Sequence, residues 1–555
     1  LNHMAESVDD KRKKKAMEVC ARQERFDTNR QPWVKLWEEI SELVDPKYVN
    51  TFRNWSMDWR TQGQLNAEKQ FDPTAALSRD RGAAAVHSML TPDTAKWHRY
   101  RSLESRHNKS AQNLRYFDET RDCVFRYRYA PKANFISQIG EVWSNLLTFG
   151  TACLYVDRLD GGGLRYRCLH LGEFFFAENH QGLVDTVHRR FKLTVRQALQ
   201  KFGDKCPEKI KEWAKDEKKK DEMLQFIHCV EPREEVEYGR MDYRGMKYAS
   251  YYVWLEEKEM ISERGYRTMP YIVFRYSTTA GEDYGRCPVM AVMPSIRVLN
   301  EEKKTVIKAG HRAVDPVLLA HDDGVVGNIN LRPGYVNYGA VDSQGRKLVH
   351  TLDTGNLPIG KELMDDERFM IRDALFVTIF QILTETPTMT ATEVLERVRE
   401  KGILLSPLGR QHEGLSMMNE RELDLLDDQR KLPEMPTELA RDGGWEAQVV
   451  YDNPLTRSMM AEEIAGFARS MEIAIQHVNA TQNPGALDWF DIDAAMPEIM
   501  DGQAVPARWV STFDKVKAMR DGRQQAVETQ QVIDAAPGLA SIIKSTGGLG
   551  MGAAA

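Results

Sequence analysis

Hydrophobic positions in the first part of the chain recur at helical spacing. From Trp33 onward, successive apolar residues are separated by 3, 1, 3, 3 and 1 positions, which predicts an amphipathic helix that ends at Asp45-Pro46. A second helix is predicted over about 74–90, where small side chains permit close packing and Leu90-Thr91-Pro92-Asp93 ends the pattern. The spacing over 110–150 predicts further helices.

Beyond Gly150 the periodicity changes to short β-rich runs separated by turn residues. The predicted strands cover residues 153–156, 165–169, 174–176, 186–191, 226–230, 251–255 and 271–275. Two stretches between them, 195–202 and 209–217, have helical spacing instead. The pattern therefore predicts an α+β region.

From Pro288 the chain reads as two long helices on either side of a Gly/Pro-rich insertion. The first helix is predicted to reach Arg312, a length of roughly 35–40 Å, and Pro294 fits only near its start or at a kink. The insertion, 313–358, has short strand patterns at 317–319, 325–326 and 347–352. Helical spacing returns over about 361–382, so the region is typical of a hairpin stalk with a tip.

The second helix of this hairpin contains an apolar stretch. Residues 374–382 are hydrophobic almost all round, as expected of a helix packed on several sides. After a break, Thr390-Ala391-Thr392-Glu393 has the spacing of a capping box and predicts a long charged helix towards Asp428, kinked at Gly402 and Pro407. The remaining predictions are a strand at 445–451, helices over about 456–530 and a disordered Gly/Ala tail at 547–555.

Composition narrows the functional classes. The chain is 42% apolar and 28% charged, as in soluble globular proteins, and its 82 acidic and 76 basic residues leave a net charge of −6. An acidic balance excludes a general DNA-coating protein, whose affinity comes from Lys and Arg on phosphates, but not a protein that surrounds DNA without gripping it. Seven scattered cysteines without a CxxC pair indicate a reducing compartment.

Targeting signals do not emerge from the sequence. We find no apolar stretch of the ~18 residues that a membrane span needs and no signal peptide, so we expect a cytosolic, soluble chain without a membrane partner. Leu1-Asn2-His3-Met4 has the form of a cloning scar, with Met4 as the expected natural start. For the basic run Lys11–Lys15, a mobile, solvated leader is favoured over nucleic-acid binding.

Sequence signatures of enzymes are absent. A phosphate-binding loop needs GxxxxGK[ST], and the nearest stretch, from Gly339 to Lys347, has the wrong spacing and no Ser or Thr. Zinc-protease, nucleophile-elbow and EF-hand patterns do not occur either. We therefore predict a protein that is not an enzyme and has no cofactor.

Two groups of residues were weighed as metal sites. His170, His180 and His188 lie closest together among the histidines, but ordinary surface or sheet positions are favoured for them. The acidic groups Asp365-Asp366-Glu367 and Asp427-Asp428 could hold Mg²⁺, although solvated helix faces are favoured. No metal site is predicted.

One ordered set of motifs is more specific than any of these patterns. It consists of Leu90-Thr91-Pro92, Phe149-Gly150-Thr151-Ala152-Cys153-Leu154-Tyr155-Val156, Tyr284-Gly285-Arg286-Cys287-Pro288, Leu299-Asn300-Glu301, Asp315-Pro316-Val317 and Met389-Thr390-Ala391-Thr392-Glu393-Val394. In this order and at these separations, over roughly residues 20–530, the chain resembles the portal, or head-to-tail connector, proteins of short-tailed double-stranded DNA bacteriophages. Cys287 stands where a Gly is expected and Asp93 where a second Pro is common, which affects local turn geometry only.

The resemblance implies a mainly helical α+β subunit of a ring of about twelve copies, with a wing, a two-helix stem, a clip and a helical crown. Mapped onto this chain, these parts are a flexible leader (1–19), the wing (20–287 and 391–454), stem helices (288–312 and 359–383), the clip (313–358), a tunnel loop (384–390), the crown (455–530) and a C-terminal tail (531–555). It also implies a place at one capsid vertex of the virion, after assembly in the host cytoplasm.

The resemblance further implies partners and site residues. Double-stranded DNA passes through the ring, the terminase large subunit and then tail or adaptor proteins dock around the clip, and capsid and scaffolding proteins surround the ring. The tunnel loop would present Thr384, Glu385, Thr386, Pro387, Thr388 and Met389 to DNA. Channel or inter-subunit charges are expected at Arg297, Lys303, Lys304, Lys308, Arg312, Asp365, Asp366 and Glu367, and clip docking at Val317, Val325, Arg332, Arg346 and Lys347.

Charge suggests how DNA would slide through such a ring. Residues 361–430 contain 15 acidic and 9 basic residues, and the tunnel-loop segment has Glu385 and no base. Because basic residues on the axis would hold phosphates, we hypothesise an acidic or neutral channel wall with Glu385 near its narrowest point. The alternative is that these acids only solvate outer helix faces.

Two rival functions stay open at this stage. One is a metal-dependent nucleic-acid enzyme that uses Asp365 and Asp366. The other is a different virion component, an adaptor or tail protein, although such proteins are usually shorter and lack the stalk–tip–stalk order.

Overall fold

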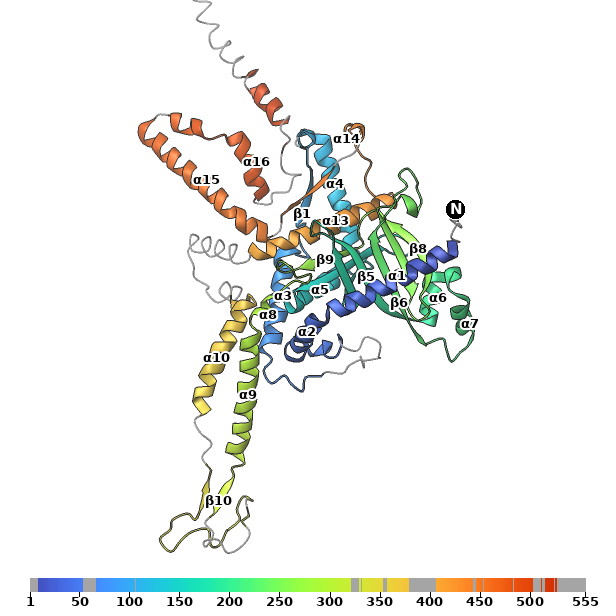
Figure 1. Cartoon of the computed structure of the whole chain (residues 1–555). Coiled ribbons are helices and arrows are strands. Elements are labelled where there is room, and N and C mark those ends of the chain that lie inside the picture. The colour runs from blue at the N-terminus through green and yellow to red at the C-terminus, as the bar shows by residue number, and fades with distance from the viewer. Residues whose placement is uncertain are drawn as a thin grey trace, which may run out of the picture. The chain divides into compact units, whose positions relative to one another are not determined.

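The chain divides into two compact units, and each is described by itself. The computed structural model describes residues 8–52, 66–104, 106–320, 329–330, 332–352, 357–378, 406–442, 446–452, 454–482, 484–502, 511, 515–523 and 525–526. The first unit comprises residues 1–101, 117–435 and 447–458, and the second comprises 102–116, 436–446 and 459–555. Helices and antiparallel sheets mix throughout the first unit, which confirms the α+β prediction (Figure 1).

Two antiparallel sheets form the body of the first unit. A five-stranded sheet has the order β4-β5-β6-β7-β8, and a three-stranded sheet has the order β3-β2-β9. Their strands are β2 (Thr151–Arg158), β3 (Leu164–Leu169), β4 (Phe174–Glu178), β5 (Val184–Thr194), β6 (Met223–Pro232), β7 (Tyr248–Trp254), β8 (Glu259–Tyr266) and β9 (Tyr271–Arg275). A further pair joins β1 (His98–Ser102) to β12 (Ala447–Tyr451).

Helices cover these sheets. Besides the hairpin described below, the helices of the first unit include α1 (Val8–Asn29), α2 (Gln31–Leu43), α3 (Thr74–Leu90), α5 (Phe135–Phe149), α6 (Val195–Phe202), α7 (Glu208–Lys215) and α13 (Gln411–Asp428), with α4 (Ala111–Arg128) shared between the units. Helix α1 runs along the five-stranded sheet, and α5 packs on β2 and β3 (Figure 1). Among the described residues, none of the helices has the length and hydropathy that crossing a membrane requires.

The helical hairpin predicted from Pro288 is present, with different bounds. The first rod is a short helix α8 (Pro288–Ala291) followed by α9 (Met293–Val314), and Pro294 lies in the first turn of α9, as predicted. The second rod is α10 (Leu357–Ala374), which runs beside α9 (Figure 1). The prediction that helix continues unbroken to 382 is wrong, because the chain leaves the helix after Ala374 and Phe376 adopts a left-handed φ of 66°.

Two other expectations differ from the structure. A flexible leader over 1–19 was expected, but α1 already begins at Val8, and Ala16 and Val19 are buried against the five-stranded sheet. The long charged helix was expected to pass through Pro407 with a kink. Instead, Pro407 belongs to a 3₁₀ turn (Ser406–Arg410), and α13 starts only after it, since proline cannot supply the backbone donor that a helix interior needs.

The second unit is mainly helical. Its elements are α14 (Thr437–Arg441), α15 (Pro454–Thr481, which begins in the first unit), a 3₁₀ turn (Pro484–Trp489) and α16 (Ile492–Gly502). His107 and Asp442, which are far apart in sequence, meet in this unit at 2.8 Å. The part of the predicted 456–530 region that the structure describes is thus helical, as expected.

Candidate functional site

The base of the hairpin is fixed by a close contact between two glycines. Gly150 ends α5 in a left-handed conformation with φ of 77°, and its Cα lies against the carbonyl of Gly285. The Gly285 N–H donates to Thr151 Oγ1 at 2.9 Å, and the Cys287 thiol donates to the Thr148 carbonyl at 3.2 Å. Two motifs from the sequence, around Gly150 and around Gly285, therefore meet directly where the first rod begins.

The upper half of the hairpin is part of the main hydrophobic core. Ile296 and Leu299 of α9 are buried with Met364 and Ile371 of α10 in the core that also contains Trp37 of α2. Gly82 of α3 permits a close approach, because a Cβ there would lie 2.6 Å from the carbonyl oxygen of Leu375. The rods are thus rigidly anchored at one end.

Polar contacts tie one side of the hairpin to residues 69–72 of the same chain. Asn300 donates to the Lys69 carbonyl and accepts from the Phe71 N–H, both at 2.7 Å. Arg368 forms an ion pair with the nearly buried Asp72, also at 2.7 Å. Burial acts to raise the pKa of Asp72, but hydrogen bonds with Thr74 and the pairing with Arg368 lower it below its usual value. The hairpin therefore has one side that faces its own subunit.

Three of the charges predicted for the channel or for subunit contacts are neutralised within the chain. Arg297 pairs with Glu39 of α2 at 2.7 Å, Lys304 pairs with Glu301 at 3.1 Å, and Asp365 pairs with Arg368 at 2.8 Å. The other predicted charges form no ion pair within the described part of the chain: Lys303, Lys308, Arg312, Asp366 and Glu367.

Two carboxylates between the rods have no counter-charge. One oxygen of Glu302 in α9 and one of Glu367 in α10 are shielded from solvent, and neither has a hydrogen-bond partner among the described residues. Burial, and then the charge of Glu367, raise the pKa of the Glu302 carboxyl above its usual value. Glu302 is not among the site residues predicted from the sequence.

The far end of the hairpin carries a short antiparallel pair, β10 (Leu318–Ala320) with β11 (Val349–Thr351). Strands were predicted at 317–319 and 347–352, while 325–326, and with it the predicted docking residue Val325, lie outside the described residues. The side chains of Val317, Arg332, Arg346 and Lys347 are exposed there, as docking residues need to be.

Tyrosines at the same tip were missed by the sequence analysis. Tyr335 is 60% exposed and Tyr338 is 86% exposed, and Val336 between them is exposed as well. Asn330 and Asn337 hold this loop through hydrogen bonds of 2.8 and 2.9 Å. Large exposed aromatic residues are the commonest anchors of protein interfaces, so Arg332-Pro333-Gly334 followed by two tyrosines was an available signal.

The predicted tunnel loop, Thr384–Met389, lies outside the described residues, so Glu385 has no structural account.

Some of the acidic residues that give 361–430 its negative charge form ion pairs inside the fold. Glu422 forms a buried pair with Arg128, and Asp424 pairs with Arg421 at 3.2 Å. These ion pairs hold α13 against its neighbours in the fold.

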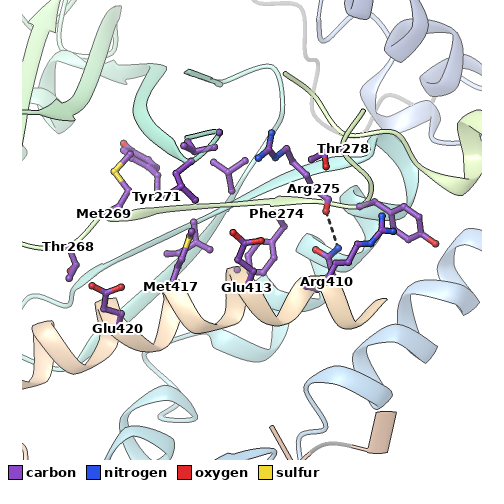
Figure 2. Close-up of a pocket in the computed structure, with 18 of the residues that line it drawn as sticks. Thr268, Met269, Tyr271, Phe274, Arg275, Thr278, Arg410, Glu413, Met417 and Glu420 are labelled. Atoms are coloured by element: carbon purple, nitrogen blue, oxygen red, sulfur yellow. Dashed lines mark hydrogen bonds between the residues drawn. The ribbon is translucent and has the colours of Figure 1, made fainter. Parts of the chain in front are cut away.

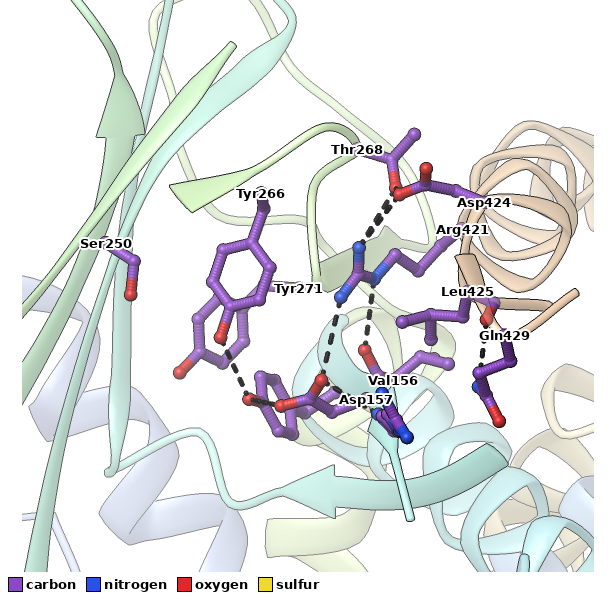
Figure 3. A network of polar contacts seen from close by, with 12 residues as sticks. Val156, Asp157, Ser250, Tyr266, Thr268, Tyr271, Arg421, Asp424, Leu425 and Gln429 are labelled. Carbon is purple, nitrogen blue, oxygen red and sulfur yellow. Dashed lines mark hydrogen bonds and ion pairs between the residues drawn. The ribbon is translucent and has the colours of Figure 1, made fainter. Parts of the chain in front are cut away.

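A network of polar contacts fastens α13 to the three-stranded sheet (Figure 3). The Arg421 guanidinium donates to the Val156 carbonyl at 3.3 Å and lies 3.7 Å from Asp157. Thr268, just before β9, donates to Asp424 at 2.8 Å, and burial raises the pKa of that carboxyl. Every member is satisfied by a neighbour, which is typical of a structural brace.

A groove with a volume of about 470 Å³ lies between β9 and α13. Figure 2 shows Glu413, Met417 and Glu420 of α13 facing Tyr271 and Arg275 of β9. The side-chain amide of Gln411 donates a hydrogen bond to the Arg275 carbonyl at 3.0 Å. Its described lining contains no histidine, cysteine or serine.

Metal chemistry finds no support in the described part of the chain, where no three His, Cys, Asp or Glu side chains group as metal ligands. His170 instead stacks on Tyr48 with ring centroids 4.4 Å apart, and His188 is buried in β5. The pKa of His188 is lowered to about 3, chiefly by burial, so it stays neutral. All seven cysteines are free and buried.

Comparison with known proteins matches residues 16–510 to the family described as bacteriophage head to tail connecting protein. The chain belongs to this family. It is 27% identical to the probable portal protein of Bordetella phage BPP-1 over 537 residues, which cover 93% of each chain. It is 23% identical to the portal protein of Salmonella phage epsilon15, over 90% of this chain and 89% of that one.

Family membership fixes the general function. The chain is a portal, or head-to-tail connector, protein of a bacteriophage virion, and it is a structural component and not an enzyme. The rival prediction of a metal-dependent nuclease is therefore discarded. What this connector touches, and through which residues, is the subject of the proposals below.

Proposed function

We propose that copies of this connector form a ring, of about twelve subunits, through which double-stranded DNA is packaged and later ejected. The observation that carries the proposal is the hairpin of α9 and α10, which is anchored in the core at one end and carries a small β tip at the other. With 22 residues, α9 is about 33 Å long. Parallel copies of such a rod would make a bore, with the hairpin as stem, its tip as clip, the sheets as wing and the second unit as crown.

Imaging of the purified chain tests the ring. We expect closed rings with a central opening wider than a DNA duplex, roughly 20 Å across, in negative-stain micrographs. Light scattering should give a mass that is a whole multiple of 63.6 kDa. Compact single subunits at every protein concentration would contradict the ring and leave the hairpin without a role in a channel.

The same rings test the hypothesis of a low-friction channel wall, in which Glu385 and other acids of 361–430 face DNA. Duplex DNA should bind assembled rings weakly. A strong affinity that falls steeply with salt, and that is lost when basic residues of the stem are replaced, would contradict the hypothesis.

We further propose that the tip docks the terminase large subunit during packaging and then tail or adaptor proteins, while the wing faces capsid and scaffolding proteins. Support comes from the exposed Tyr335 and Tyr338, which belong to the same tip segment as the exposed bases Arg332, Arg346 and Lys347. Aromatic residues beside arginine are the usual composition of binding hot spots.

Replacing Tyr335 and Tyr338 together with alanine should weaken binding of the cognate terminase large subunit at least about tenfold. Ring formation and melting temperature should not change, because both side chains are exposed. Tyr238, which is 91% exposed outside the hairpin, offers the matched control Tyr238→Ala. Undiminished binding by the double variant would show that the motor docks elsewhere.

A further inference from the structure

The two sides of the hairpin differ in charge. Glu302 and Glu367 mark one side, which we call the acidic flank. Positions three or four residues away lie on the same helix face, and these positions bring exposed apolar side chains next to the acids. They are Val298 (45% exposed), Leu363 (52%) and Met370 (46%).

The acidic flank is an incomplete surface as it stands in one subunit. Its two carboxylates each have a shielded oxygen without a partner among the described residues, and the charge of Glu367 adds to burial in raising the pKa of Glu302. Shielded carboxylates are normally paired or hydrogen-bonded, and three large apolar side chains on one narrow face are seldom left in water. Both features call for a partner that brings positive charge and apolar contact.

The opposite side, which we call the basic flank, carries that chemistry. Asn300 and Arg368 define it, because both face residues 69–72. Helical spacing from these two residues places Lys303 and Ile307 of α9, and Lys361 and Arg372 of α10, on the same side. The three bases have no ion pair with any described residue, and Ile307 is exposed.

Sequence neighbours illustrate how sharply the hairpin is divided. Glu302 and Lys303 are adjacent in the sequence, but their side chains lie on opposite sides of the line along which α9 packs on Met364 and Ile371. Within one subunit, the acidic side chain therefore cannot form an ion pair with the basic one across the hairpin. Two subunits in the same orientation, side by side, can.

We propose that the acidic flank of one copy of this chain docks on the basic flank of the next copy. Glu302 and Glu367 then receive Lys303 and Lys361 of the neighbour, and Val298, Leu363 and Met370 pack around Ile307. The contact joins two different faces, so it is heterologous and leads to a closed ring when the rotation between copies divides a full turn. This inference rests on the proposed ring and names the surfaces that build its stem.

Charge reversal tests the pairing. The acid-to-base variant Glu302→Lys/Glu367→Lys has two basic flanks, and the base-to-acid variant Lys303→Glu/Lys361→Glu has two acidic flanks. Each should lower the fraction of chain in rings about tenfold at fixed protein concentration, measured by light scattering after size exclusion. The variant with all four changes should recover ring formation to within about threefold of the unchanged chain.

Mixing provides a second, independent result. An equimolar mixture of the two double variants should form rings in which they alternate, because every contact then joins a basic flank to an acidic flank. Such rings contain an even number of subunits, which imaging reports directly. The neutral variant Glu302→Gln/Glu367→Gln should lie between the unchanged chain and the reversed one.

Glu413→Lys/Glu420→Lys is the matched control, because it makes the same change of net charge at two exposed acids of α13, outside the hairpin. It should form rings normally, and circular dichroism should show that all variants are folded. The flank pairing is wrong if the unchanged chain forms rings and both double variants form them equally well. It is also wrong if neither the variant with all four substitutions nor the mixture of the two double variants recovers ring formation. If the unchanged chain never forms rings, the proposed function fails instead.

Discussion

Replacing Glu422 with alanine is expected to lower the free energy of unfolding of the first unit by about 3–5 kcal/mol. Glu422 of α13 and Arg128 of α4 are fully buried, and the Arg128 Nε donates to Glu422 at 3.0 Å. Asn419 accepts a second Arg128 hydrogen bond at 2.8 Å, and Tyr166 donates to Glu422. Burial acts to lower the pKa of Arg128, and Glu422 raises it above its usual value. Without the carboxylate, the guanidinium stays charged, because arginine is not deprotonated in proteins, and it is then buried with no counter-ion.

Chemical denaturation followed by tryptophan fluorescence measures this loss. The double variant Arg128→Met/Glu422→Leu should lose less than Glu422→Ala alone, because no buried charge remains unpaired. Glu237→Ala is the control, since Glu237 pairs with Arg240 on the surface, and it should cause no measurable change. Equal losses for Glu422→Ala and the double variant would mean that packing, and not charge, dominates at this site.

Helices and strands with a strong local pattern could be predicted from the sequence. The apolar spacing from Trp33 to Val44 and the small residues over 74–90 predicted helices, and α2 and α3 form there. Strand β8 was missed because Met260 and Ile261 are followed by polar residues, and its place is set by pairing with β7. Helix α10 was extended too far, because an apolar run cannot show that Phe376 turns into the left-handed region.

The sequence shows which residues of the candidate site are charged, but it does not show with which residues they form ion pairs. Composition located Arg297 and Lys303 in the first rod, yet only the fold shows that one is neutralised by Glu39 and the other is not. Pairing depends on tertiary contacts between segments far apart in sequence, such as Arg128 with Glu422, which no local spacing encodes. The shielded acids Glu302 and Glu367 belong to the same class, since their proximity follows from the packing of α9 on α10.

Replacing Gly150 with alanine is expected to destabilise the first unit by more than about 3 kcal/mol. A side chain at this position must hold a φ of 77°, which costs non-glycine residues energy, and its Cβ would overlap the backbone carbonyl of Gly285. Backbone cannot move aside as a flexible side chain can. If the backbone moved to relieve this overlap, Gly285 would shift away from Thr151 and would carry Pro288, the first residue of α8, with it. The base of the hairpin should therefore be held less firmly.

Melting temperature and ring fraction together check this prediction, because Gly150→Ala should lower both. Gly140→Ala is the matched control in the same helix α5, where a Cβ has no atom within 4 Å. There, alanine should stabilise the chain slightly, by about 0.5–1 kcal/mol, through its better helix propensity. If the two variants melt alike, the contact between Gly150 and Gly285 does not set the position of the hairpin. A loss of rings without a loss of stability would instead place its effect on the orientation of α9.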